Sequence, residues 1–164
     1  MVVRKICCLP NDLVLRQKAK RVPAVDSSIQ RLIGDMLETM RQVGGVGLAA
    51  PQIGVSLRVI VVQLPDEEPI AVVNPEIVKR TGEREVLEGC LSVPGYAGHI
   101  KRSVSVTVKG WDRTGKRVRI KATGLLAQAL EHELDHLNGV LFIDRIESPD
   151  KLHRVEAETQ AEGM

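Results

Sequence analysis

The spacing of hydrophobic residues predicts two long helices with a block of strands between them. Apolar residues recur every three or four positions over 29–40 and again over 125–137, as on one face of a helix. Ser27 or Ser28 opens the first of these segments, because serine often caps the amino end of a helix. A third, polar helix is expected after Pro149.

Between the two long helices, the pattern is typical of β-strands. Runs rich in β-branched residues predict strands over 55–64, 70–78 and 84–91. Apolar and polar residues then alternate over 104–120 on both sides of a turn at 111–115, which predicts a hairpin with one dry face. Because the strands form one block and do not alternate with helices, we expect an α+β fold. Its mostly antiparallel sheets would pack around the second long helix.

Composition and charge are those of an ordinary globular protein. The 164 residues include 23 basic and 21 acidic side chains and are 43% hydrophobic, which fits a single domain over 1–164. Only 2% are aromatic, too few for a module that stacks RNA bases on rings. No apolar run approaches the ~18 residues of a membrane span, and no secretory signal opens the chain. Three cysteines, two of them adjacent, argue against disulfides, so a cytoplasmic location is expected, with an organelle not excluded.

The strongest chemical signal is the pentapeptide His132-Glu133-Leu134-Asp135-His136 in the second long helix. Residues four apart lie one helical turn above each other, so both imidazoles can bind one metal ion. Glu133 projects about 100° away from His132 and can act as a general base and then a general acid on a water molecule. The alternative is a buried amphipathic helix that matches the pattern by chance.

A catalytic metal site usually has three protein ligands, so a third ligand must come from elsewhere. Acidic residues beyond Asn138-Gly139 show no helical register with the histidines. Cys90 lies beside a glycine in Glu88–Ser92, and a thiolate binds borderline metals strongly, although an inert buried thiol is the alternative. A third segment, Gly45–Gln52, is rich in glycine and alanine and ends in an amide that can donate hydrogen bonds.

Together, these three segments resemble the signature of the peptide deformylases. The family motifs have the forms GxGLAAxQ, EGCLS and HExDH, and the chain carries them unbroken and in this order at 45–52, 88–92 and 132–136. The resemblance runs from the opening segment to the segment after Pro149. It implies a metal-dependent hydrolase that removes the N-formyl group from the initiator methionine of newly made polypeptides and releases formate.

The resemblance also implies roles for individual residues. The implied ligands of one divalent ion are Cys90, His132 and His136. The ion is Fe(II) in the family, with Zn(II) or Ni(II) in some purified relatives. Water on the metal would attack the formyl carbon with Glu133 as general base and acid. Gln52 and the backbone N–H of Leu91 would stabilise the charge on the formyl oxygen.

A pocket for the methionine side chain is expected beside the metal. Leu125 and Ala129 lie on the same helical stripe as the two histidines, and Val46 and Val86 match family positions that complete the pocket. The backbone positions expected to pair with the peptide as an added strand are Val46, Gly47 and Gly89.

Charged residues near the motifs have two interpretations. Glu88 and Asp135, with Arg102 as a counter-charge, either support the metal ligands or are solvated surface charges. The eight basic residues within 101–121 either form a solvated face or face ribosomal RNA, so ribosome proximity stays an expectation. The acidic segment 147–164 argues against the basic carboxy-terminal docking helix of some relatives. We expect no membrane partner and no sequence-specific nucleic acid.

Two other functions compete with deformylation. A metallopeptidase could use the same histidine–glutamate helix to cut internal peptide bonds. A structural metal module would need a fourth ligand, which the sequence does not offer, and would leave Glu133 without a role.

Overall fold

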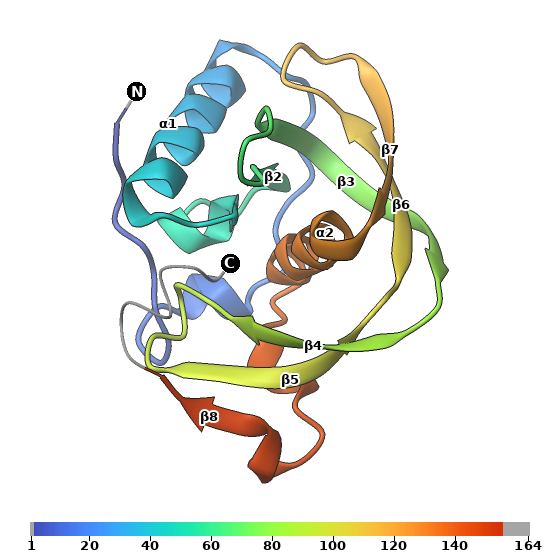
Figure 1. Cartoon of the computed structure of the whole chain (residues 1–164). Coiled ribbons are helices and arrows are strands. Elements are labelled where there is room, and N and C mark those ends of the chain that lie inside the picture. The colour runs from blue at the N-terminus through green and yellow to red at the C-terminus, as the bar shows by residue number, and fades with distance from the viewer. Residues whose placement is uncertain (1, 156–164) are drawn as a thin grey trace.

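Two long helices and two antiparallel sheets make up the structure, a computed structural model that describes residues 2–155 (Figure 1). Helix α1 spans Ser27–Val43 and helix α2 spans Gly124–Leu137. The strands are β1 (Gly47–Ala49), β2 (Val59–Val62), β3 (Ile70–Thr81), β4 (Arg84–Gly89), β5 (Tyr96–Arg102), β6 (Ser105–Trp111), β7 (Arg117–Thr123) and β8 (Leu152–Arg154). Four short 3₁₀ turns cover Leu13–Arg16, Ala50–Ile53, Phe142–Arg145 and Pro149–Lys151.

The strands form one sheet of five and one of three, with α2 between them. The orders are β1-β2-β3-β6-β7 and β4-β5-β8, and neighbouring strands are antiparallel. A turn at Gly82-Glu83 carries the chain from β3 into β4, and the two sheets wrap around α2 (Figure 1). Strands β1 and β4 carry parts of the first two motifs, and each is an edge strand of its sheet. They flank α2, the helix that carries the third motif.

Helix α1 forms because one face is apolar and both ends are capped. The side chain of Asp26 accepts a hydrogen bond from the backbone N–H of Ile29 at 3.0 Å, so the cap is this aspartate and not the expected serine. Gly44, at φ 68°, ends the helix in the left-handed conformation. The buried face, from Ile29 to Met40, packs against β2, and each large side chain buried there contributes about 1.5–3 kcal/mol.

Helix α2 is buried nearly all round, which is unusual for a helix with so many polar residues. Its apolar residues pack against the inner face of the five-stranded sheet, in a cluster that includes Ile60, Val62, Val106, Val108, Ala127, Leu130, Leu134 and Leu137. The polar residues buried on the same helix are Gln128, Glu131, His132, Glu133, Asp135 and His136. Buried polar groups cost free energy unless they have partners, so the surroundings of these six side chains decide what the helix can do.

The sequence predicted the α+β class, the two long helices and the hairpin, and the structure confirms them. Strand β5 was not predicted, because Ala97-Gly98 near its start has low strand propensity. The helix predicted after Pro149 is wrong over the described residues, which form a 3₁₀ turn and then β8. Pairing of β8 with β5 outweighs the local helical tendency there, and the rest of that prediction lies outside the described residues. Among the described residues, no helix is long and apolar enough to cross a bilayer.

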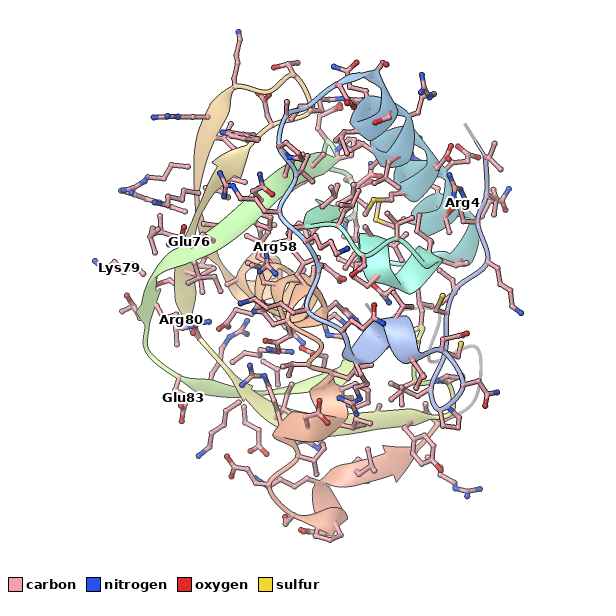
Figure 2. The ribbon with its side chains drawn as sticks, turned by 180° about the vertical axis from the view of Figure 1, so that it is seen from behind. Arg4, Arg58, Glu76, Lys79, Arg80 and Glu83 are labelled. Atoms are coloured by element: carbon pink, nitrogen blue, oxygen red, sulfur yellow. The ribbon has the colours of Figure 1, made fainter. Side chains whose placement is uncertain are left out.

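We predict that Arg58 stabilises the end of α2 that carries His136. Arg58 is labelled in Figure 2. Its guanidinium donates to the carbonyl of Leu137 at 2.9 Å and to Oδ1 of Asn138 at 3.0 Å, where the helix leaves carbonyls unpaired. Arg58→Ala should lower the free energy of unfolding of the metal-free protein by about 1.5–3 kcal/mol in urea denaturation. Lys18→Ala, at an exposed position of the neighbouring segment, is the control. An equal loss in both variants would contradict this role.

Candidate active site

The fold brings the three predicted metal ligands together. Cys90 follows the last residue of β4, and His132 and His136 lie one turn apart on α2. Nε2 of His136 lies 3.3 Å from Sγ of Cys90 and 3.2 Å from Nε2 of His132. All three ligand atoms lie within 4.8 Å of one another, and the three residues are buried. They could therefore hold one metal ion.

The donor set and its spacing fit a divalent metal ion. Ligand atoms about 2.0–2.3 Å from a tetrahedral ion lie about 3.3–3.6 Å from one another, close to the separations found here. Nδ1 of His132 lies 2.6 Å from the Glu88 carboxylate, which places the proton on Nδ1 and leaves the Nε2 electron pair for a metal. Burial lowers the pKa of His136 well below its ordinary value, which keeps that imidazole neutral and able to bind an ion.

Three buried charged residues form a hydrogen-bonded set on the Nδ1 side of the His132 ring. Arg102 donates to Glu88 through Nε at 3.0 Å and Nη2 at 2.6 Å, and to Asp135 through Nη1 at 2.8 Å. Burial alone would raise the pKa of Glu88, but the charges and hydrogen bonds of His132 and Arg102 prevail and lower it to about 2. Glu88, Asp135 and Arg102 are all buried, so they are not solvated surface charges.

Glu133 lies beside the ligand trio, which is Cys90, His132 and His136, and its carboxylate is unpaired. It is fully buried, and neither carboxylate oxygen has a hydrogen-bond partner among the described residues. Burial raises the pKa of Glu133 to about 7, a value suited to accepting and returning a proton at neutral pH. The side chain packs against β1, where a Cβ on Gly47 would lie 2.5 Å from Oε2 of Glu133. Gly47 of the first motif therefore leaves space for the side chain of Glu133 in the third motif.

The amide of Gln52 is held in one orientation near Cys90. Its Oε1 accepts from the backbone N–H of Ala49 at 3.0 Å, and its Nε2 donates to Oγ of Ser92 at 3.1 Å. The same Nε2 lies 3.7 Å from Sγ of Cys90, so the N–H groups of the amide face the trio. Leu91 follows Cys90 directly. Ser92 had no predicted role, and its place within the second motif was the only signal for one.

The residues predicted for the methionine pocket fall in different surroundings. Val46 and Ala129 contact the same apolar cluster between α2 and the five-stranded sheet, and Ala129 is fully buried. Val86 belongs instead to the cluster that contains Cys90. Leu125, on the first turn of α2, belongs to neither cluster and keeps 43% of its surface exposed. Three of the four residues therefore contact buried apolar clusters, whereas Leu125 lies at the surface.

A thiol and two imidazoles that converge at ligand spacing define a metal site, and Glu133 and Gln52 add an acid–base group and a hydrogen-bond donor beside it. These five groups together are typical of metal-dependent hydrolases.

Comparison with known proteins places this hydrolase in a family. The family model for polypeptide deformylase matches residues 3–152. A peptide deformylase from Dehalococcoides mccartyi (strain CBDB1) is 58% identical over 156 residues, covering 94% of this chain and 93% of the relative. A peptide deformylase structure from Legionella pneumophila is 51% identical with a TM-score of 0.87, covering 98% of this chain and 94% of that one. Another, from Synechococcus elongatus in complex with actinonin, is 43% identical with a TM-score of 0.85, covering 89% and 80%. The chain therefore belongs to the polypeptide deformylase family.

We predict that Gly47→Ala disables the site without removing its metal. The added methyl group would lie 2.5 Å from Oε2 and 3.0 Å from Cδ of Glu133, so the carboxylate must move. Deformylation of a formyl-Met peptide should fall about 10²-fold or more, the contribution of a positioned acid–base group. Gly45→Ala is the matched control, because its nearest neighbour is the flexible end of Leu91 at 3.2 Å. Equal activity in the two variants, at equal metal content, would contradict the steric argument.

Proposed function

We propose that the trio and its neighbours carry out the reaction of the family, the metal-dependent removal of the N-formyl group from newly made polypeptides. The observation that carries this proposal is the convergence of Cys90, His132 and His136 at ligand spacing beside the unpaired carboxylate of Glu133. Each of these four residues is buried, so the reaction takes place where water is largely excluded and electrostatic interactions are strong.

The three ligands would hold one divalent ion, for which we propose Fe(II) on the strength of the family resemblance. A thiolate with two imidazoles also suits Zn(II) and Ni(II), so the donor set does not choose among these ions. When bound, such an ion acts as a Lewis acid and lowers the pKa of coordinated water. The support of His132 by Glu88 favours metal binding, because it fixes the ring and its tautomer.

Glu133 moves the proton in this proposal. Its carboxylate accepts a proton from the attacking water, whose oxygen forms the new bond to the formyl carbon. The same residue then donates that proton to the methionine nitrogen as the carbon–nitrogen bond breaks, which gives formate and a free amino terminus. A buried carboxyl group with a pKa of about 7 is able to do both at neutral pH.

Gln52 and Leu91 stabilise the negative charge that develops on the formyl oxygen. The Gln52 amide is held by Ala49 and Ser92 before substrate arrives, so no reorganisation is needed during the reaction. The backbone N–H of Leu91, next to the ligand cysteine, is the second proposed donor. Loss of one such donor typically costs about 10²–10³ in rate.

The substrate main chain would lie extended between β1 and β4. Each of these strands is an edge strand, so one side of its backbone can accept an added strand. Gly47 and Gly89 are the proposed pairing positions, whereas the carbonyl of Val46 already accepts from the N–H of Gln63 at 2.8 Å. The methionine side chain would contact a small set of apolar residues, namely Val46, Val86, Leu125 and Ala129.

The decisive experiment compares three forms of one peptide, with formyl, acetyl or free amino termini. We expect formate release from the formyl peptide alone, with the chain left whole, whereas cleavage of internal bonds would show a metallopeptidase.

Glu133→Gln keeps the shape of the side chain but not its proton transfer. It should lower the rate about 10²–10⁴-fold at unchanged metal content, as measured by formate release and metal analysis.

Leu125→Glu tests the methionine pocket. Because Leu125 is 43% exposed and lies away from the metal ligands, a glutamate there should not disturb the fold or the metal content. A charge at the pocket wall should disfavour the apolar methionine side chain and raise KM for a formyl-Met peptide. Leu87→Glu, also at an exposed leucine, is a control for surface charge. Unchanged kinetics in Leu125→Glu would remove this residue from the pocket.

Three broader proposals follow from the family. The whole of 1–164 would form one catalytic domain, and the family match over 3–152 supports this. A cytoplasmic location is proposed, since newly made polypeptides are the substrate. Ribosome proximity stays a proposal that rests on the resemblance. Exposed basic residues on β7, together with Lys79 on β3, would face a phosphate-rich partner, and Lys79 points outward in Figure 2.

A further inference from the structure

Arg145 lies outside all three motifs, yet its guanidinium holds a residue of the third. It ends the 3₁₀ turn Phe142–Arg145, just beyond α2. Its Nε donates to Oδ2 of Asp135 at 2.7 Å and its Nη2 donates to Oδ1 at 2.8 Å, so both carboxylate oxygens are bound in a fork. The Arg145 side chain is 42% exposed, whereas that of Asp135 is 11% exposed. The contact therefore reaches from the surface to a buried carboxylate.

From Asp135, a continuous line of charged hydrogen bonds leads to a metal ligand. Oδ2 of Asp135 also accepts from Nη1 of Arg102 at 2.8 Å. The other edge of Arg102 binds both oxygens of Glu88, at 3.0 and 2.6 Å, and Glu88 lies 2.6 Å from Nδ1 of His132. The order is Arg145, Asp135, Arg102, Glu88 and His132, with the charges alternating in sign from the first to the fourth.

The position of Arg102 depends on both carboxylates that it joins. Its side chain is only 2% exposed, so a shift away from either acid would leave a buried charge poorly paired. Asp135 can fix Arg102 only if its own carboxylate is fixed. The Arg145 fork supplies this constraint, because two parallel hydrogen bonds set the plane of the carboxylate as well as its position. Arg102 in turn presents two donors to Glu88 in the orientation that His132 requires.

We propose that Arg145 is a positioning residue for His132, acting through Asp135, Arg102 and Glu88 to hold the ligand imidazole in its binding orientation. The proposal rests on the proposed metal site and adds to it a surface residue that no motif contains. Its prediction concerns the affinity for a metal ion, because a misoriented ring offers its electron pair poorly. Stability alone would not reveal this role, since the loss of any partly buried ion pair can lower it.

The test uses Arg145→Gln and a matched variant, Arg16→Gln. Arg16 forms an ion pair with Asp144 of the same 3₁₀ turn, and its side chain is 40% exposed. Its other contact is the backbone carbonyl of Gly139, so within residues 2–155 no line of side-chain hydrogen bonds joins it to a ligand imidazole. The dissociation constant of Zn(II) is measured on metal-free full-length protein by competition with a chromophoric chelator. Arg145→Gln should weaken Zn(II) binding about 10-fold, as the loss of outer partners of metal ligands does, and Arg16→Gln should leave it unchanged.

Three further variants test the route and the need for the fork. If Arg145 acts through Asp135, then Arg145→Gln added to Asp135→Asn should weaken Zn(II) binding no further than Asp135→Asn alone. Arg145→Lys keeps the charge but not the fork, so its Zn(II) affinity should lie between those of the unaltered protein and Arg145→Gln. It also replaces Arg145→Gln if that variant does not fold.

Two results would overturn the proposal. One is Zn(II) binding in Arg145→Gln, or in Arg145→Lys where that variant is used, as tight as in the unaltered protein. The other is an additive loss in the double variant. Failure of the unaltered protein to bind Zn(II), or to release formate from a formyl peptide, would instead contradict the proposed function.

Discussion

Burial of the polar side chains of α2 determines which of them the fold must pair. A helix enclosed by two sheets cannot leave imidazoles and carboxylates without partners at no cost. Glu131 binds Ser103 and Arg80, and Asp135 binds Arg102 and Arg145, so both acids are paired within the protein. The electron pairs of His132 and His136 instead converge with the thiol of Cys90, and Glu133 lies unpaired beside them. Once the other acids are paired, the residues that remain are those proposed to bind the metal ion and to transfer the proton.

The same burial explains why the charged residues linked to His132 form a line of hydrogen bonds and not a single ion pair. A buried pair recovers its desolvation cost only when the remaining donors and acceptors are also satisfied. Arg102 meets this condition by binding Glu88 on one edge and Asp135 on the other. Each contact fixes the next, and the line ends at a partly exposed guanidinium where water can solvate the charge of Arg145. The orientation of a metal ligand is thereby linked to the surface.

Gly47 of the first motif is a glycine for a steric reason. It faces the carboxylate of Glu133 so closely that no side chain fits between them. Gly89 of the second motif has more space, because a Cβ there would lie 3.4 Å from the carbonyl of Tyr96, an ordinary contact. Both glycines lie on edge strands.

Periodicity and motif spacing are local properties of the chain, so the two long helices, the hairpin, the α+β class and the three motifs could all be predicted from the sequence. The contacts that support the motifs became known only from the folded structure. Arg145 beside Asp135 carries no local signal, and the contact of Ser92 with Gln52 joins two different motifs, so both depend on how distant segments pack. Strand β8 likewise forms where a helix was predicted, because pairing with β5 outweighs local propensity. Ligand identity follows from residue type and spacing, whereas ligand orientation follows from contacts between segments far apart in the sequence.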